Sequence, residues 1–254
     1  IPEGVVDTEI EEVDISKAVK GGRTPYIFTK ESGPDWLQVD WQGKITGTRP
    51  STETAATTAV IKVTDKDNTV QTFTIAVGAV TLPKGYSITG KVESYNPNVK
   101  PSIKLMQGSV EAYDVDPADI VAESTSGGKI IHKLTFKNVL PGTYDLVVTK
   151  DAHLKYTIKN VVVGDTPLDL MTHANAAIST MTLLAGDIDS DGWIDFADYQ
   201  ELLKSTNYGK QTSTAGVNKI TDLDGDTWVD FSDYQILLSS QHYGKSAVSV
   251  GFAA

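Results

Sequence analysis

Two short stretches near the C-terminal end of the chain are nearly identical and begin thirty-five residues apart. Residues 187–198 read DIDSDGWIDFAD, and residues 222–233 read DLDGDTWVDFSD. The likeness continues beyond both stretches, because Tyr-Gln, Leu-Leu, Ser and Tyr-Gly-Lys recur at matching offsets. The duplicated unit is therefore a loop together with the helical segment that follows it. This tandem constrains the fold more than any other feature of the chain.

Each stretch places aspartates at positions 1, 3, 5, 9 and 12 of a loop, the spacing by which a short loop surrounds a calcium ion with oxygen ligands. Position 7 would contribute a backbone carbonyl oxygen, and position 9 commonly acts through a water molecule. The sequence therefore predicts two calcium ions as its cofactors. Their expected ligands are Asp187, Asp189, Asp191, Trp193, Asp195 and Asp198 in the first loop, and Asp222, Asp224, Asp226, Trp228, Asp230 and Asp233 in the second.

Both loops depart from an ordinary EF-hand. Position 12 is Asp rather than Glu, and no convincing helix precedes Asp187. Position 6, where such a loop turns through a positive φ, is Gly192 in the first loop but Thr227 in the second. A β-branched residue is strained there. We expect each repeat to be half an EF-hand, a loop followed by one helix. We expect the second loop to bind calcium more weakly or with altered geometry.

Two alternatives to this interpretation are open. The tandem could be a regulatory or buffering EF-hand pair, or its acidic loops could be solvated and hold no metal. Carboxylates this close repel one another unless a cation lies between them, which disfavours the second alternative.

An amphipathic helical pattern follows each loop, over residues 196–205 and 231–240. Apolar side chains recur at i, i+3 and i+4, so each helix carries one apolar stripe that would face the other helix. The residues of these stripes are Tyr199, Leu202 and Leu203 in the first repeat and Tyr234, Leu237 and Leu238 in the second.

Residues 186–245, with Asp at position 12 and no entering helix, resemble the dockerins over their whole length. Dockerins are modules that join enzymes and scaffolding proteins to cohesins in cellulosomes. The resemblance implies a small all-α module that binds a cohesin of another scaffoldin or anchoring protein. By resemblance, the partner-binding residues are Phe196, Ala197, Gln200, Leu203, Lys204, Tyr208, Phe231, Ser232, Gln235, Leu238, Ser239 and Tyr243.

Two points about this face remain open. Burial between the helices is the alternative for Phe196, Phe231, Leu203 and Leu238. The near identity of the two repeats also allows two binding orientations related by roughly 180°.

The rest of the chain has the period-2 alternation and turn signals of β-strands. The expected fold is multidomain: two all-β sandwiches over residues 1–83 and 84–184, then a small all-α dockerin-like module with two calcium loop-helix repeats over residues 185–254. The predicted strands cover residues 26–29, 36–41, 59–64 and 73–77 in the first sandwich, and 86–92, 109–113, 133–136, 143–149, 156–163 and 177–184 in the second.

Both sandwiches carry resemblances of their own. The segments PYIF at 25–28, GPDWL at 33–37 and GKITGT at 43–48 resemble bacterial immunoglobulin-like or cadherin-like repeats. The segment FKNVLPGTYDLVV at 136–148 resembles the carboxypeptidase-regulatory-like sandwich. A β pattern directly before a duplicated calcium loop is similar to the X module of cellulosomal proteins, which implies the C-terminal part of a scaffoldin and a sandwich that buttresses the dockerin.

Composition excludes several classes of function. The formal net charge of −11 argues against a nucleic-acid partner, which needs clustered Lys and Arg. With 0 Cys there is no disulfide framework, thiolate metal site or Cys nucleophile. No apolar run reaches the roughly 18 residues needed to span a bilayer. No catalytic motif is visible, so we expect neither an enzyme nor a small-molecule substrate.

The sequence also suggests where the protein acts and how the chain arises. Weak calcium loops need the high calcium found outside cells, which favours a secreted chain, associated with the cell surface through its partner. The start at Ile1 suggests a processed chain or a C-terminal fragment. A calcium-stiffened adhesin or polysaccharide-binding stalk, and the tail of a secreted glycoside hydrolase, are alternative functions.

Two features of the first sandwich have competing interpretations. Trp36 and Trp41 could form an aromatic platform for sugar, but at strand spacing they are expected in or near the core. Asp65, Asp67 and Asn68 could ligate calcium in cadherin fashion, but an ordinary hairpin turn is the favoured interpretation.

Overall fold

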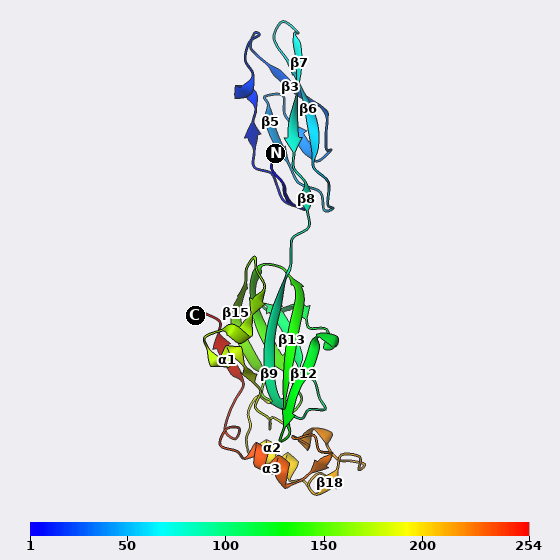
Figure 1. The fold of residues 1–254 in the computed structure, drawn as a ribbon, viewed down its shortest axis with the longest axis vertical. Coiled ribbons are helices and arrows are strands. Elements are labelled where there is room, and N and C mark those ends of the chain that lie inside the picture. The colour runs from blue at the N-terminus through cyan, green and yellow to red at the C-terminus, as the bar shows by residue number, and fades with distance from the viewer. Residues whose placement is uncertain (254) are drawn as a thin grey trace. The chain divides into compact units, whose positions relative to one another are not determined.

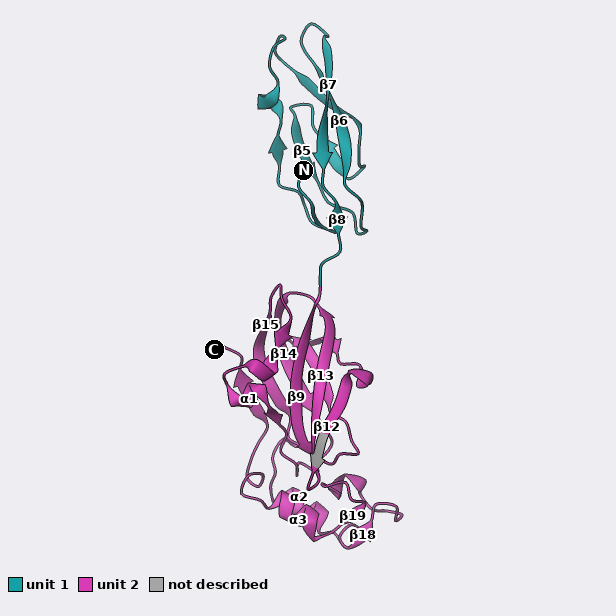
Figure 2. Ribbon diagram, in the orientation of Figure 1, with its two compact units in different colours: residues 1–84 teal, residues 85–254 magenta. Residues whose placement is uncertain are grey.

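The structure of this chain, a computed structural model, describes residues 1–253, except for the side chains of Ser124 and Thr125. The chain divides into two compact units, Ile1–Lys84 and Gly85–Ala254 (Figure 2). The second unit contains both the predicted second sandwich and the predicted dockerin-like module, whose last residue, Ala254, lies outside the described residues. Within the described residues, no helix is long and apolar enough to cross a membrane.

The first unit is a small β-sandwich. One sheet has the strand order β2-β5-β4 and the other β3-β6-β7, while β1 pairs with β8 in parallel. Its core is built from alternate residues of these strands, among them Leu37, Ile45 and Ile61. The elements are β1 (Gly4–Val5), β2 (Val13–Asp14), the 3-10 turn η1 (Ser16–Ala18), β3 (Ile27–Ser32), β4 (Leu37–Val39), β5 (Lys44–Gly47), β6 (Thr57–Thr64), β7 (Val70–Val77) and β8 (Val80–Thr81).

The two open questions in this unit have different outcomes. Trp36 is half-buried against the core, as predicted, but Trp41 is 63% exposed, so its predicted place in or near the core is wrong. Trp41 lies in the turn between β4 and β5, where the strand alternation no longer sets its direction. The Asp65 carboxylate accepts backbone N–H groups of Asp67 (2.9 Å) and Thr69 (2.8 Å). This confirms the hairpin turn between β6 and β7.

The second unit contains a larger sandwich (Figure 1). One sheet has the order β11-β10-β14-β15-β20 and the other β12-β13-β9-β16, with β17 also paired to β9. The core between the sheets includes Ile88, Leu105, Phe136 and Leu146, all buried. The strands are β9 (Tyr86–Tyr95), β10 (Ser102–Gln107), β11 (Val110–Asp114), β12 (Ile120–Ser126), β13 (Lys129–Val139), β14 (Gly142–Thr149), β15 (Tyr156–Val163), β16 (Leu168–Asp169), β17 (Met181–Thr182) and β20 (Val248–Gly251), with 3-10 turns η2 (Pro117–Asp119) and η3 (Leu170–Thr172).

The predicted last strand of this sandwich, residues 177–184, is wrong. The segment forms a short helix, α1 (Ala176–Ser179), followed by the two-residue strand β17. Asn175 caps the helix by accepting the N–H of Ala177, and the turn lets Ile178 and Met181 both reach the core. The last strand is instead β20, which comes from the end of the chain and pairs in parallel with β15.

The two helices of the tandem are α2 (Phe196–Leu202) and α3 (Phe231–Leu237), which are shorter than the predicted 196–205 and 231–240. Leu202 and Leu237 are buried in a second core, and the other residues of the predicted stripes pack against it. Both helices lie at one end of the larger sandwich (Figure 1). The tandem also holds η4 (Lys219–Thr221) and the antiparallel pair β18 (Lys210–Gln211) and β19 (Trp228–Val229), so it is not all-α as predicted.

The segment that follows α2 pairs with the second loop. Gly209 donates its N–H to the carbonyl of Val229 (2.7 Å), and Thr212 donates to the carbonyl of Thr227 (2.9 Å). The tail of the first repeat therefore completes the loop of the second.

The segment that follows α3 pairs with the first loop in the same way. Ile194 donates to the carbonyl of Lys245 (2.9 Å), and Ala247 donates to the carbonyl of Gly192 (3.0 Å). The two repeats thus exchange their tails, which relates them by a pseudo-two-fold axis.

Candidate functional site

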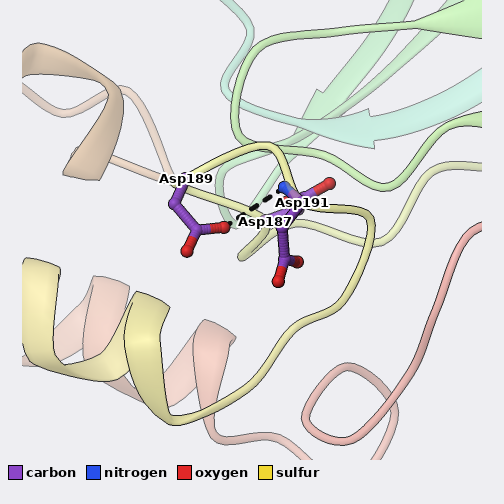
Figure 3. A group of neighbouring side chains, drawn as sticks. All are labelled: Asp187, Asp189 and Asp191. Carbon is purple, nitrogen blue, oxygen red and sulfur yellow. Dashed lines mark hydrogen bonds between the residues drawn. The ribbon is translucent and has the colours of Figure 1, made fainter.

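Three carboxylates converge in each loop. Oxygens of Asp187, Asp189 and Asp191 lie within 4.8 Å of one another in the first loop, as do those of the equivalent three residues, Asp222, Asp224 and Asp226, in the second. Figure 3 shows the first group. Positions 1, 3 and 5 of both predicted calcium loops are therefore brought together.

Backbone hydrogen bonds inside each loop hold these side chains in place. In the first loop, Asp189 accepts the N–H of Asp191 (3.2 Å), which in turn accepts the N–H of Trp193 (2.8 Å), and the first of these bonds is drawn in Figure 3. Such Asx turns wind the chain tightly enough for alternate side chains to point inward. The second loop repeats both bonds at its positions 3 and 5.

Positions 9 and 12 have another role in this structure. Asp195 caps α2 by accepting the N–H of Ala197 (2.8 Å), and the Asp198 carboxylate accepts the N–H groups of Ile188 (2.6 Å), Asp189 (3.2 Å) and Asp195 (2.8 Å). Asp198 is fully buried. The carboxylate at position 12 therefore ties the start of the loop to the start of the helix.

This reciprocal pattern is a capping box, in which the residue before the helix and the third residue of the helix each accept a backbone N–H of the other, and the second repeat has it too. Asp230 accepts the N–H of Ser232 (2.8 Å), while the buried Asp233 accepts from Leu223 (2.6 Å), Asp224 (3.3 Å) and Asp230 (2.9 Å). Neither position 9 nor position 12 belongs to the carboxylate groups found among the described residues. Calcium ligation by Asp195, Asp198, Asp230 and Asp233 stays a prediction.

The backbone of each loop turns through positive φ at positions 4 and 6. The residues are Ser190 (φ 64°) and Gly192 (φ 89°) in the first loop, and Gly225 (φ 78°) and Thr227 (φ 81°) in the second. The positive φ expected at Thr227 is confirmed. Each loop thus has one glycine and one strained residue, in opposite order.

Contact with the sandwich explains why the second loop has its glycine at position 4. A Cβ on Gly225 would lie 2.7 Å from Oδ1 of Asn96 and 2.9 Å from Nδ2 of Asn98. The same two asparagines donate to the carbonyls of Asp222 (2.9 Å) and Gly225 (2.6 Å). The second loop is therefore seated on the turn after β9.

A buried lysine shapes that turn. The Lys150 ammonium donates to the Ser94 hydroxyl (2.9 Å) and to the carbonyls of Tyr95 (2.5 Å) and Asn96 (2.7 Å). Burial lowers the pKa of Lys150 to about 8. This contact was not predictable from the sequence, because a single lysine at the end of a strand gives no signal of it.

The electrostatics of the loops suit a cation. Burial, with a smaller contribution from neighbouring aspartates, raises the pKa of Asp187 to about 6 and that of Asp233 to about 7. Burial also raises the pKa values of Asp198 and Asp222. Clustered carboxylate oxygens are the donors that calcium prefers, so the aspartates at positions 1, 3 and 5 of each loop fit the ion.

At position 7, the side chains of Trp193 and Trp228 point into solvent, with 53% and 43% of their surface exposed. This agrees with their predicted role, which needs only the backbone carbonyl. The role itself stays a prediction.

An aromatic row runs across the two helices. Phe196 stacks on Tyr199 and Phe231 on Tyr234, with ring centroids 5.6 Å apart in both pairs, while Tyr199 and Tyr234 meet at 6.1 Å. Both phenylalanines are 58% exposed. The alternative that Phe196 and Phe231 are buried between the helices is therefore wrong.

The remaining predicted partner-binding residues divide between surface and core. Leu203 and Leu238 are half-buried against the helix core, which is close to the alternative that they are buried between the helices. Ser232 and Ser239 are also half-buried, and Lys204 is exposed but paired with Glu201. The other residues, Ala197, Gln200, Tyr208, Gln235 and Tyr243, are exposed.

Comparisons with known proteins extend to part of the chain. Residues 5–78 match the family described as "Putative Ig domain", in agreement with the immunoglobulin-like sandwich of the first unit. No curated protein sequence matches the chain.

Among solved structures, the chain is similar to a chain from an N-terminal interface mutant of the type II cohesin-X-dockerin complex of Acetivibrio cellulolyticus, with 22% identity, 64% of this chain and 98% of that chain covered, and a TM-score of 0.43. A chain from the C-terminal interface mutant of the same complex gives 21% identity, coverage of 64% and 98%, and a TM-score of 0.42. Because these scores are low, the function of this chain is inferred from its own residues.

Proposed function

We propose that the tandem of residues 186–245 is a calcium-dependent protein-interaction module of the dockerin type. It binds a cohesin of another scaffoldin or anchoring protein, outside the cell, and has no catalytic role. The larger sandwich buttresses it, as in an X module. The observation that carries the proposal is that each carboxylate loop leads directly into a helix whose first residue is an exposed, stacked phenylalanine.

Calcium would be required for the loops to hold this surface in shape. The carboxylates at positions 1, 3 and 5 repel one another when charged, so the loops need a divalent ion to keep their shape at neutral pH. The ion supplies positive charge that these oxygens share. The chain itself positions the surface, because the capping box of Asp195 and Asp198 joins loop and helix rigidly.

The symmetry of the face supports a partner that can bind in two orientations. Phe196 with Tyr199 and Phe231 with Tyr234 have nearly the same ring geometry, with interplanar angles of 20° and 18°. Exposed aromatic residues are enriched where proteins bind one another. A single partner surface could therefore accept either helix.

The direct test is calorimetric titration of the full chain with a panel of cohesins, at saturating calcium and again in excess chelator. We expect binding to one cohesin type in calcium and none in chelator. Binding that is unchanged by chelator, or no binding to any cohesin while calcium is bound, would contradict the proposal.

Trp41 favours a second candidate function, a polysaccharide-binding stalk. Its indole is 63% exposed on the first unit, and an exposed aromatic ring can stack on a sugar. Affinity electrophoresis in plant polysaccharides, with Trp41→Ala as the variant and the half-buried Trp36 left intact, tests this second function. Retardation that Trp41→Ala removes would support the stalk, and equal mobility of both proteins would contradict it.

A further inference from the structure

The chain does not end after α3 but returns to the larger sandwich. We call residues 244–252 the strap. Its first part runs antiparallel to the first loop: Gly244 donates to the carbonyl of Ile194 (2.8 Å), Ile194 donates back to Lys245 (2.9 Å), and Ala247 donates to Gly192 (3.0 Å). Positions 6 and 8 of the first loop are therefore bonded to the strap.

The second part of the strap is β20, which forms the edge of a sheet of the sandwich. Val248 donates to the carbonyl of Lys155 (2.9 Å), and Phe252 donates to that of Lys159 (2.8 Å). The side chains of Val248, Val250 and Phe252 pack against the sandwich core. One short segment thus contacts the first loop at one end and the sandwich at the other.

The second loop has no equivalent connection within the described residues. Its partner segment, β18, is followed by a turn in which Thr214 donates to Gln211 (2.9 Å), so the chain stays within the tandem. The second loop meets the sandwich instead through the side chains of Asn96 and Asn98. The pseudo-symmetry of the repeats is therefore broken at the strap.

The strap contacts the first loop on both sides of an expected calcium ligand. Gly192 and Ile194 flank Trp193, whose carbonyl is the expected ligand at position 7. Gly192 also donates its N–H to Asp187 (3.4 Å), the carboxylate at position 1. Pairing with the strap fixes the peptide groups on both sides of that carbonyl, so ordering by the strap and ordering by an ion act on the same atoms.

We propose that the strap couples the first calcium site to the sandwich, so that calcium in the first loop and pairing of β20 with β15 stabilise each other. Whichever forms first has already ordered the peptides that the other requires, and such a coupling is reciprocal. The inference rests on the proposed function only in that the first loop binds calcium. It needs no protein partner.

The first experiment measures hydrogen exchange of the full chain, in saturating calcium and in chelator. We expect calcium to slow exchange of the amides that face β15, those of Val248, Val250 and Phe252, in the wild type by roughly fivefold or more. Asp187→Asn should abolish this response, and the matched control in the second loop, Asp222→Asn, should retain it. An unchanged response in Asp187→Asn, or equal loss in both variants, overturns the coupling.

The second experiment tests the reverse direction with terbium, which replaces calcium and is excited by the tryptophan at position 7. In a Trp228→Phe background the signal reports the first loop, and in Trp193→Phe it reports the second. Val250→Pro, placed in β20 between the two donors to β15, should weaken terbium binding to the first loop by roughly fivefold or more and leave the second unchanged.

Ser249→Pro is the matched control. Ser249 is exposed and alternates with the residues that donate to β15, so its own N–H faces the free edge, where proline is tolerated. Equal affinity of the Val250→Pro and Ser249→Pro variants for terbium contradicts the coupling alone. Absence of terbium and calcium binding in every variant overturns the proposed function as well.

Discussion

At the scale of single residues, the two loops differ most at position 6. Thr227 has φ 81°, a conformation that is costly for a β-branched residue, while Gly192 has φ 89° without strain. The sequence predicted this difference, because loop position alone determines where the chain must turn. The sequence did not predict the positive φ of Ser190 at position 4. Its counterpart in the second loop is Gly225, where contact with the sandwich requires a glycine, and the sequence carries no sign of that contact.

We expect Thr227→Gly to stabilise the second unit in calcium by about 1 kcal/mol, because it removes the strained conformation. Thermal unfolding and terbium affinity in the Trp193→Phe background measure this. Ser190→Gly is the matched control in the first loop, where the gain should be smaller because serine is not β-branched. A lower unfolding temperature for Thr227→Gly would show that Thr227 makes a compensating contact.

The two buried aspartates Asp187 and Asp233 contribute to the stability of the metal-free protein with a sign opposite to that of an ordinary paired carboxylate. Their folded pKa values (about 6 and about 7) lie above the ordinary value of 3.8. The stability that they contribute is therefore present at low pH and is lost as pH rises through 6 to 7. Burial lowers the pKa of His132 to about 4 and that of His153 to about 3, so these histidines act in the opposite direction over the same range.

Replacing Asp187 by Asn isolates the contribution of one aspartate, because asparagine is neutral at every pH. In chelator we expect Asp187→Asn to raise the unfolding temperature of the second unit at pH 7.5 and to change it little at pH 5, where Asp187 is itself largely protonated. About 1 kcal/mol shifts the midpoint of a domain of this size by roughly 2–4 °C. In saturating calcium the variant should instead be less stable than the wild type at pH 7.5, because it lacks a ligand. Calorimetry at the two pH values measures both, and an equal change at pH 5 and pH 7.5 in chelator would contradict this assignment.

At the scale of elements, most long alternating strands were predicted, but β10, β12 and the short irregular segments were not. Residues 156–163 were predicted as a strand and form β15 with the same bounds. Residues 177–184 alternate too, but the cap at Asn175 turns them into α1, a local hydrogen bond that periodicity does not detect. The alternation at 248–251 was a usable signal for β20. The strand that it pairs with, β15, lies about ninety residues earlier, and the alternation does not identify it.

The two helices allow a test of the interaction face. We expect Phe196→Ala and Phe231→Ala each to leave cohesin affinity within about twofold, because the other helix still offers an intact face. The double variant should lose roughly thirtyfold or more, as for an aromatic hot spot. Titration calorimetry in calcium measures this, with Trp41→Ala, in the other unit, as the control. Loss of binding in one single variant would show that only one orientation is used.

At the scale of the whole molecule, the two units are separately compact, but the tandem and the larger sandwich form one unit. The sequence predicted where the β-rich segments lie. It could not predict the bonds of Asn96 and Asn98 to the second loop, because polar side chains in a turn carry no periodic signal of a distant partner.

Removal of calcium should therefore act on one unit only. We expect calorimetry of the full chain to show two transitions in calcium, and chelator to lower the transition of residues 85–254 while that of residues 1–84 stays in place. A single transition, or equal shifts in both, would indicate that the two units unfold together.

The exchange of tails between the two repeats leaves neither repeat complete on its own. One repeat alone has a loop whose strand partner is missing and a tail that has no loop to pair with. Two identical copies would satisfy each other by the same hydrogen bonds that join residues 209–212 to the second loop and 244–247 to the first. The tandem therefore has the form of a homodimer fused into one chain.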